Sequence, residues 1–143
     1  MKIRRISRYS DRVYEAALKL LPQLNPEPPL PSKDDFRRFL KSESTHFFIA
    51  ETEDKNIAGM LTLISYIIPT GPKFWIEDVV VDESQRGKGI GRDMMLLVID
   101  YAAAIGAKSV DLTSRPFRKA ANKLYLDLGF ELRETNAYRY FIK

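Results

Sequence analysis

The feature that most constrains the fold is a glycine-rich turn between a strand-like run and a long helical pattern. Residues 76–92 read IEDVVVDESQRGKGIGR. The consecutive valines Val79–Val81 predict a buried strand, and apolar residues that recur about every 3.6 positions predict a helix that runs to about Ile105. A buried strand, a turn and a helix in this order predict a domain in which helices cover a sheet.

The turn itself has the chemistry of an anion site. The glycines of Gly87–Gly91 let the backbone approach a ligand closely, and the first N–H groups of a helix have no partner within the helix. Arg86, Lys88 and Arg92 add positive charge beside them. Together with the helix dipole, these groups favour phosphate.

Two common phosphate-binding patterns are excluded. A Walker P-loop needs a glycine five positions before its Gly-Lys pair and a Ser or Thr after it, but the chain has Asp82 and Gly89 at these places. A dinucleotide fingerprint that starts at Gly87 or Gly89 needs Gly or Ala at position 92 or 94, where Arg92 and Met94 stand. A plain glycine-rich surface turn is the alternative that this stretch alone leaves open.

The remaining pattern, Arg86 to Gly91, resembles the acetyl-coenzyme A signature of the GNAT N-acetyltransferase family, Arg/Gln-x-x-Gly-x-Gly/Ala. A second stretch, residues 117–130 (FRKAANKLYLDLGF), is similar to the later helix of that family, which carries an Asn and a Tyr and closes on Gly-Phe. The matching residues are Asn122, Leu124, Tyr125, Gly129 and Phe130. The resemblance covers the chain from about Ile3 to its end.

We therefore expect one N-acetyltransferase domain, residues 1–143, with a GNAT-like mixed α/β sheet in the order β-α-α-β-β-β-α-β-α-β-β. Ser10 and Ser32 are expected to cap the first two helices, and Pro22 to end or kink the first. Strand 108–113 should lie parallel to the strand before the glycine turn. The expected strands are residues 2–9, 45–53, 57–68, 74–81, 108–113, 130–133 and 138–142.

Composition narrows the chemistry. The chain has no cysteine, which excludes a cysteine nucleophile. With His46 as the single histidine, we expect no metal site and a structural role for His46. No apolar stretch is long enough to cross a membrane, so a cytoplasmic protein is expected. The net charge of +4 comes from basic residues spread along the chain, which fits an anionic cofactor at least as well as nucleic acid.

The resemblance implies roles for particular residues. Glu77 stands at the start of the central strand, where the family often places its general base, and Asp78 is the reserve. Simple alternation would place Glu77, Val79 and Val81 on one face of this strand and Asp78 and Val80 on the other. A base is needed because an alkyl amine of pKa about 10.4 is almost entirely protonated at pH 7, and supplying the neutral form costs about 4.6 kcal/mol.

Tyr125 is the expected partner of the departing thiolate, as a hydrogen-bond donor or acid, and Asn122 is expected to bond the pantetheine arm. The backbones of Val79 and Val81 should pair with the pantetheine amides like a neighbouring strand. Arg115, Arg118 and Lys119 could meet the 3′-phosphate or be ordinary surface charges. The expected cofactor-binding residues are Val79, Val81, Arg86, Gly87, Lys88, Gly89, Ile90, Gly91, Arg92 and Asn122.

The resemblance thus implies direct transfer of an acetyl group from acetyl-CoA to a primary amine in a ternary complex. The acceptor, a small molecule or a protein amine, is left open; Glu27, Asp34, Asp35 and Glu43 could attract a cationic one. A non-catalytic acyl-CoA sensor of the same fold is the alternative, and a basic nucleic-acid-binding domain is a third hypothesis. The apolar segment 138–142 could pair across a homodimer or lie within its own sheet.

Overall fold

The computed structural model describes all residues, 1–143, as two compact units, residues 1–113 and 114–143. Each unit is described by itself. The first contains β1 (Lys2–Ile6), α1 (Asp11–Leu24), α2 (Lys33–Lys41), β2 (Thr45–Glu51), β3 (Ile57–Ile68), β4 (Gly71–Val81), a 3₁₀ turn (Glu83–Gln85) and α3 (Ile90–Ala104). The second contains α4 (Lys119–Asp127).

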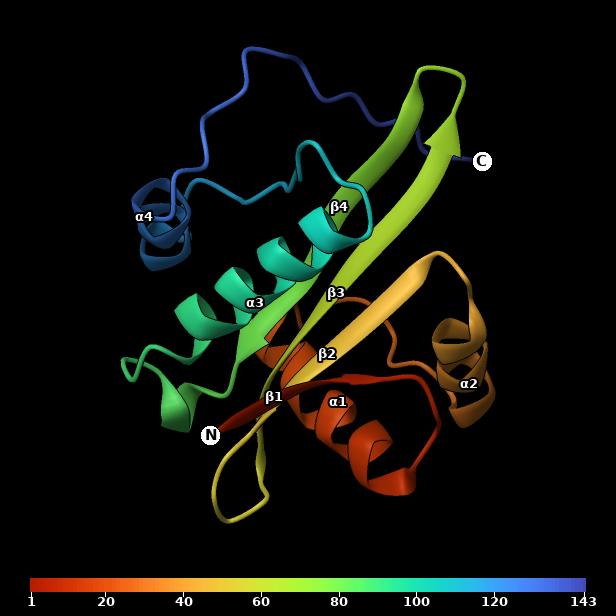
Figure 1. The fold of residues 1–143 in the computed structure, drawn as a ribbon. Coiled ribbons are helices and arrows are strands. Elements are labelled where there is room, and N and C mark those ends of the chain that lie inside the picture. The colour runs from red at the N-terminus through yellow and green to blue at the C-terminus, as the bar shows by residue number, and fades with distance from the viewer. The chain divides into compact units, whose positions relative to one another are not determined.

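The first unit is built on an antiparallel sheet with the strand order β1-β2-β3-β4. Helices α1 and α2 cover one face of this sheet and α3 covers the other (Figure 1). The long hairpin of β3 and β4 continues past the end of β2, since Thr45, the first residue of β2, already pairs with Ile64. β4 is the edge strand, and its outer side carries one parallel bridge, Trp75 to Asp111.

Both faces of the sheet are packed with apolar side chains. On the α1 and α2 face, aromatic side chains dominate, and Phe36 meets Phe47 edge-on with 5.8 Å between the ring centroids. On the other face, α3 buries Met94, Met95, Val98 and Ala102 completely. The predicted apolar face of this helix is confirmed from Met94 to Ala102, whereas Ile105, just after its end, is 43% exposed.

The predicted caps of the first two helices are present. The Ser10 hydroxyl accepts from Val13 N at 3.2 Å, and Ser32 and Asp35 form a complete capping box at the start of α2. Pro22 does not end α1, which continues to Leu24. Because Pro22 lies in the last turn, the helix loses only one hydrogen bond to it.

The prediction of three strands after α3 is wrong for this structure. Residues 108–113 form the single bridge at Asp111, and no strand is assigned to 130–133 or 138–142. A strand needs a hydrogen-bonded neighbour, and an alternating pattern does not reveal which neighbour is present. The apolar side chains of the last segment, from Leu132 to Ile142, are 74–95% exposed.

None of the helices combines the length and the apolar character that a membrane span requires.

Candidate active site

The glycine-rich turn presents open backbone at the start of α3. Gly87 and Gly89 both have φ of 80°, a left-handed conformation that side chains other than glycine rarely adopt. A Cβ added to either glycine would meet no atom within 4 Å, and no side chain caps the helix at Gly89. The first amides of α3 therefore face open space with no side-chain acceptor, as an anion site requires.

The cations beside the turn have different tasks. Arg86 Nε donates to the carbonyl of Val81 at 3.0 Å, which holds the turn against the end of β4. Lys88 Nζ donates to Gln85 Oε1 at 3.0 Å. Arg92 lies in the first turn of α3 and makes no hydrogen bond or ion pair. Arg86 thus shapes the turn, and Arg92 is the cation that is free to meet a ligand.

Helix α1 supports the turn from the other side of the sheet, which the sequence did not suggest. Lys19 Nζ lies 3.0 Å from Asp82 Oδ2, and Gln23 Oε1 accepts from Glu83 N at 2.8 Å. Asp82 is buried, and its hydrogen bond with Lys19 lowers the pKa of its carboxyl. No motif could reveal these contacts, because about 60 residues separate the partners in the chain.

A bulge interrupts β4 at the expected catalytic carboxylates. Glu77 pairs with Thr62 and Val80 pairs with Met60, so Asp78 and Val79 lie opposite the single residue Leu61. Asp78 has φ of 50°, and aspartate is among the residues that tolerate this left-handed conformation. The predicted alternation is therefore wrong: Glu77 shares a face with Val80, the face covered by α1 and α2.

The environment makes both carboxylates stronger bases than usual. The Glu77 and Asp78 side chains are exposed, and partial desolvation by neighbouring atoms, followed by the charge of Asp78, raises the pKa of Glu77. Partial desolvation alone raises the pKa of Asp78. Desolvation disfavours the charged form of a carboxyl group, so each holds a proton to a higher pH than a free carboxyl would. This is the direction that a general base needs.

Backbone groups at the outer edge of β4 are available beyond the bridge to Asp111. Ile76 N donates to Asp111 O at 2.9 Å, whereas Asp82 N points the other way and donates to Ala58 O at 2.7 Å. Because peptide directions alternate along a strand, the groups of Val81 and, by the same alternation, Val79 point away from β3. The contact of Val81 O with Arg86 agrees with this direction.

The second unit carries the other two expected residues on α4. Asn122 Nδ2 donates to the carbonyls of Arg115 and Arg118, both at 2.9 Å, so it orders the segment before the helix and leaves its side-chain oxygen for other partners. Tyr125 lies one turn later, with its pKa raised by burial against a smaller opposite effect of Arg118. It is therefore protonated at neutral pH.

The Gly129-Phe130 pair of the motif forms the C-terminal cap of α4. Phe130 N donates to Tyr125 O at 2.9 Å and Gly129 N to Leu126 O at 3.0 Å, which is the Schellman pattern with Gly129 in the left-handed conformation. The Phe130 ring also packs edge-on against Tyr125, with 5.9 Å between centroids. The motif thus fixes the ring of Tyr125 at the end of the helix.

The acidic residues suggested as attractors of a cationic acceptor are in part explained by local contacts. Asp34 pairs with Arg37, and Asp35 pairs with Arg38 while it completes the capping box of α2. His46 is buried, and its ring nitrogens lie 2.9 Å from the hydroxyls of Tyr101 and Ser65. These contacts agree with the structural role predicted for the histidine.

Comparison with known proteins decides the family. Residues 10–130 match the model of the Acetyltransferase (GNAT) family. The chain belongs to this family. A putative acetyltransferase from Agrobacterium tumefaciens has the same fold, with a TM-score of 0.85 and 24% identity over 99% of this chain and 100% of that one. The predicted fold class, a mixed α/β GNAT fold, is confirmed.

Two further proteins resemble this chain. An uncharacterised N-acetyltransferase from Methanocaldococcus jannaschii is 30% identical over 101 residues, which are 69% of this chain and 45% of that protein. An aminoglycoside acetyltransferase from an uncultured soil sample superposes with a TM-score of 0.87 at 18% identity, over 99% of this chain and 95% of that one. The GNAT chain spans about half the length of the curated relatives it matches.

Proposed function

We propose that this GNAT protein transfers the acetyl group of acetyl-CoA to a primary amine. The single observation that carries the proposal is the open backbone of the glycine-rich turn at the uncapped start of α3. Gly71, Gly106 and Gly129 also combine a positive φ with open space, so what distinguishes this turn is that its two left-handed glycines lead into a helix start without a side-chain cap.

The donor substrate fits the residues that are present. The amides at the start of α3, with Lys88 and Arg92, would hold the pyrophosphate of coenzyme A. The outward peptide groups of Val79 and Val81 would pair with the pantetheine amides, and the oxygen of Asn122 remains to bond that arm. The remaining residues of the turn, Arg86, Gly87, Gly89, Ile90 and Gly91, set its shape.

Acetyl transfer begins with removal of a proton from the acceptor ammonium. Glu77, with its raised pKa, would take this proton directly or through water, with Asp78 as the alternative. The neutral nitrogen then attacks the thioester carbonyl, the C–N bond forms, and the C–S bond breaks to release the thiolate. The nitrogen gives its second proton to water, which balances the proton that the thiolate takes up. With no cysteine in the chain, direct attack in a ternary complex is the simplest route.

Tyr125 would stabilise the departing thiolate. A free thiol titrates near 8.5 and tyrosine near 10, and burial raises the pKa of Tyr125 further. Full transfer of its proton to the thiolate is therefore uphill. Tyr125 acts best as a hydrogen-bond donor to the developing charge, and the thiolate then takes its proton from water.

The acceptor is proposed to be an amine of a small molecule rather than of a protein. One fold neighbour is named an aminoglycoside acetyltransferase, and the carboxylates of Glu77 and Asp78 would suit a cationic acceptor. We propose that the proline-rich segment between α1 and α2, residues 25–31, helps to shape the acceptor pocket. The acceptor's identity requires a panel of amines.

Calorimetric titration of the purified protein with acetyl-CoA tests the proposal. We expect saturable binding with Kd near micromolar, about −8 kcal/mol. Gly89→Trp, which fills the open space at the turn, should abolish binding. Gly89→Ala is the matched control, because it introduces the same backbone strain without the bulk and should retain more affinity.

Coenzyme A release in the presence of an amine panel then separates an enzyme from a sensor. Thiol release that depends on an amine supports the proposed transferase. Binding of acetyl-CoA without turnover for any amine would favour a non-catalytic sensor of the same fold. No binding to the wild type would overturn both.

A further inference from the structure

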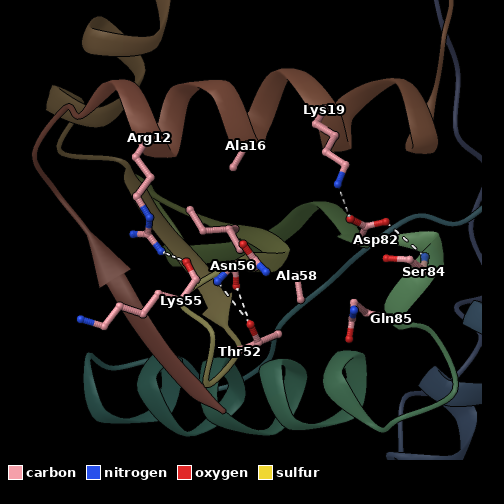
Figure 2. A pocket seen from close by; sticks show the side chains of 11 residues that line it. Arg12, Ala16, Lys19, Thr52, Lys55, Asn56, Ala58, Asp82, Ser84 and Gln85 are labelled. Atoms are coloured by element: carbon pink, nitrogen blue, oxygen red, sulfur yellow. Dashed lines mark hydrogen bonds and ion pairs between the residues drawn. The ribbon is translucent and has the colours of Figure 1, made fainter.

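The first unit contains a pocket of about 350 Å³ that has no part in the proposed function. It lies between α1, the β2–β3 turn and the segment Asp82–Gln85, on the far side of that segment from the glycine-rich turn (Figure 2). Its volume is at the lower end of the range for small-molecule sites. It is too small for coenzyme A but large enough for a compact metabolite.

The shape of the pocket follows from small residues on two facing elements. Helix α1 turns Arg12, Ala16 and Lys19 toward it, at the spacing of one helix face. Ala58, at the start of β3, faces Ala16, and the two short side chains leave the space between them open (Figure 2). Arg12 therefore stands toward one end of the slot and Lys19 toward the other. The rise of the helix between these two residues makes the slot about 10 Å long.

The lining of the pocket has an excess of positive charge. Arg12, Lys19 and Lys55 are its three cations, and Asp82 is its single carboxylate, which leaves a net charge of +2. An adjoining pocket shares Arg12 and Lys55 and adds two cations, Lys2 and Arg4, and two carboxylates, Glu51 and Glu53, so it leaves this excess unchanged.

The hydrogen bonds inside the pocket leave donors unused. Arg12 Nη2 donates to Glu51 Oε2 at 2.6 Å and to the carbonyl of Lys55. The other guanidinium nitrogens of Arg12 have no partner. Lys19 is paired with Asp82. The ammonium of Lys55, on the rim, and the carboxamide of Asn56, which points into the space, make no hydrogen bond or ion pair.

We propose that this pocket binds a small polyanion, a metabolite that carries two or more carboxylate or phosphate groups. Arg12 and Asn56 line the space with unused donors, and the ammonium of Lys55 stands at its rim and points outward (Figure 2), so a neutral or cationic ligand would leave the excess charge uncompensated. The slot with a cation toward each end suits anionic groups at both ends of the ligand. The site is separate from the glycine-rich turn, so it does not depend on the proposed acetyl transfer.

Calorimetric titration of the full chain with citrate, and separately with inorganic pyrophosphate, tests the proposal. Whichever probe binds more tightly identifies carboxylate or phosphate as the ligand chemistry. Lys55→Asn removes one charge and suits the backbone, because Lys55 has φ of 62° and asparagine tolerates this conformation. Asn56→Ala removes a donor without any change in charge.

We expect each of these two variants to weaken binding of the tighter probe at least fivefold. Lys41→Gln, which removes an exposed charge at the end of α2, should leave the affinity unchanged, and so should Gly89→Trp, which fills the glycine-rich turn. Equal weakening in Lys41→Gln would mean general charge attraction and overturn the proposal. Loss of binding in Gly89→Trp, or no binding tighter than about 10 mM by either probe, would overturn it as well.

Discussion

At the scale of single residues, the candidate site is defined by environment as much as by residue type. Glu77 and Asp78 are adjacent, exposed carboxylates, and both have a raised pKa because partial desolvation disfavours their charged form. Tyr125 has a raised pKa for the same reason. Partial desolvation therefore makes the carboxylates stronger bases, and burial keeps the phenol protonated as a donor.

Tyr125→Phe removes the proposed donor to the thiolate and keeps the ring that packs on Phe130. We expect turnover to fall by about 10²-fold or more, within the usual range of acid–base contributions. The affinity for acetyl-CoA should change little, since the substitution alters no group of the glycine-rich turn. Thiol release measures the first quantity and calorimetry the second. Unchanged turnover would remove Tyr125 from the mechanism.

Glu77→Gln tests the base through pH dependence. Since the folded protein raises the pKa of Glu77, kcat/KM should fall as pH drops through that raised value, where the carboxylate becomes protonated. The variant should lose about 10²-fold in kcat/KM and lose this limb of the profile. Asp78→Asn is the matched control. If Asp78→Asn shows the larger loss, the reserve residue is the base.

At the scale of elements, α1 acts as a support for the glycine-rich turn. The contact between Gln23 and Glu83 N joins the last turn of α1 to the segment that enters the turn. We expect Gln23→Ala to raise KM for acetyl-CoA about threefold to tenfold with little change in kcat, because one neutral hydrogen bond is worth about 1 kcal/mol. Gln23→Glu keeps an acceptor oxygen and should retain the wild-type KM. Equal KM values in all three proteins would contradict this support.

His46 joins β2 to α3 through Tyr101 and to β3 through Ser65. Burial, and then the charge of Arg5, hold its pKa below 6.5, so the unfolded chain binds this proton at a higher pH than the folded one. Stability is therefore lost as pH falls through about 6.5. We expect Tm to drop more between pH 7.5 and 5.5 in the wild type than in His46→Gln. A Tyr101→Phe variant, which keeps the histidine, should keep the steeper drop.

The elements also show which parts of the structure could be predicted from sequence. The caps at Ser10 and Ser32 were predicted correctly because they depend on residues within a few positions. The bounds of β3 were predicted correctly because turn-forming residues flank its apolar run. The bulge at Asp78 was not, because it depends on how β4 meets β3. The support from Lys19 and Gln23 depends on partners about 60 positions away. The strands predicted for 130–133 and 138–142 failed because alternation cannot supply a neighbour.

At the scale of the whole molecule, the candidate residues are divided between the two units. The glycine-rich turn and Glu77 belong to residues 1–113, whereas Asn122 and Tyr125 belong to residues 114–143. Every buried apolar side chain of the core belongs to the first unit. The first unit thus contains its own core, and the proposed chemistry needs both units.

A shortened chain that ends at residue 113 tests separately whether the first unit folds by itself and whether residues 114–143 are needed for turnover. We expect it to unfold cooperatively, because it keeps the whole buried core and the bridge at Asp111, and to lose turnover by about 10²-fold or more with the loss of Tyr125. Circular dichroism on heating measures the first and thiol release the second, with full-length Tyr125→Phe as the matched control for turnover. A larger loss than in that control would assign further catalytic groups to residues 114–143. Loss of cooperative unfolding would instead show that these residues complete the core, and that the chain folds as one inseparable domain.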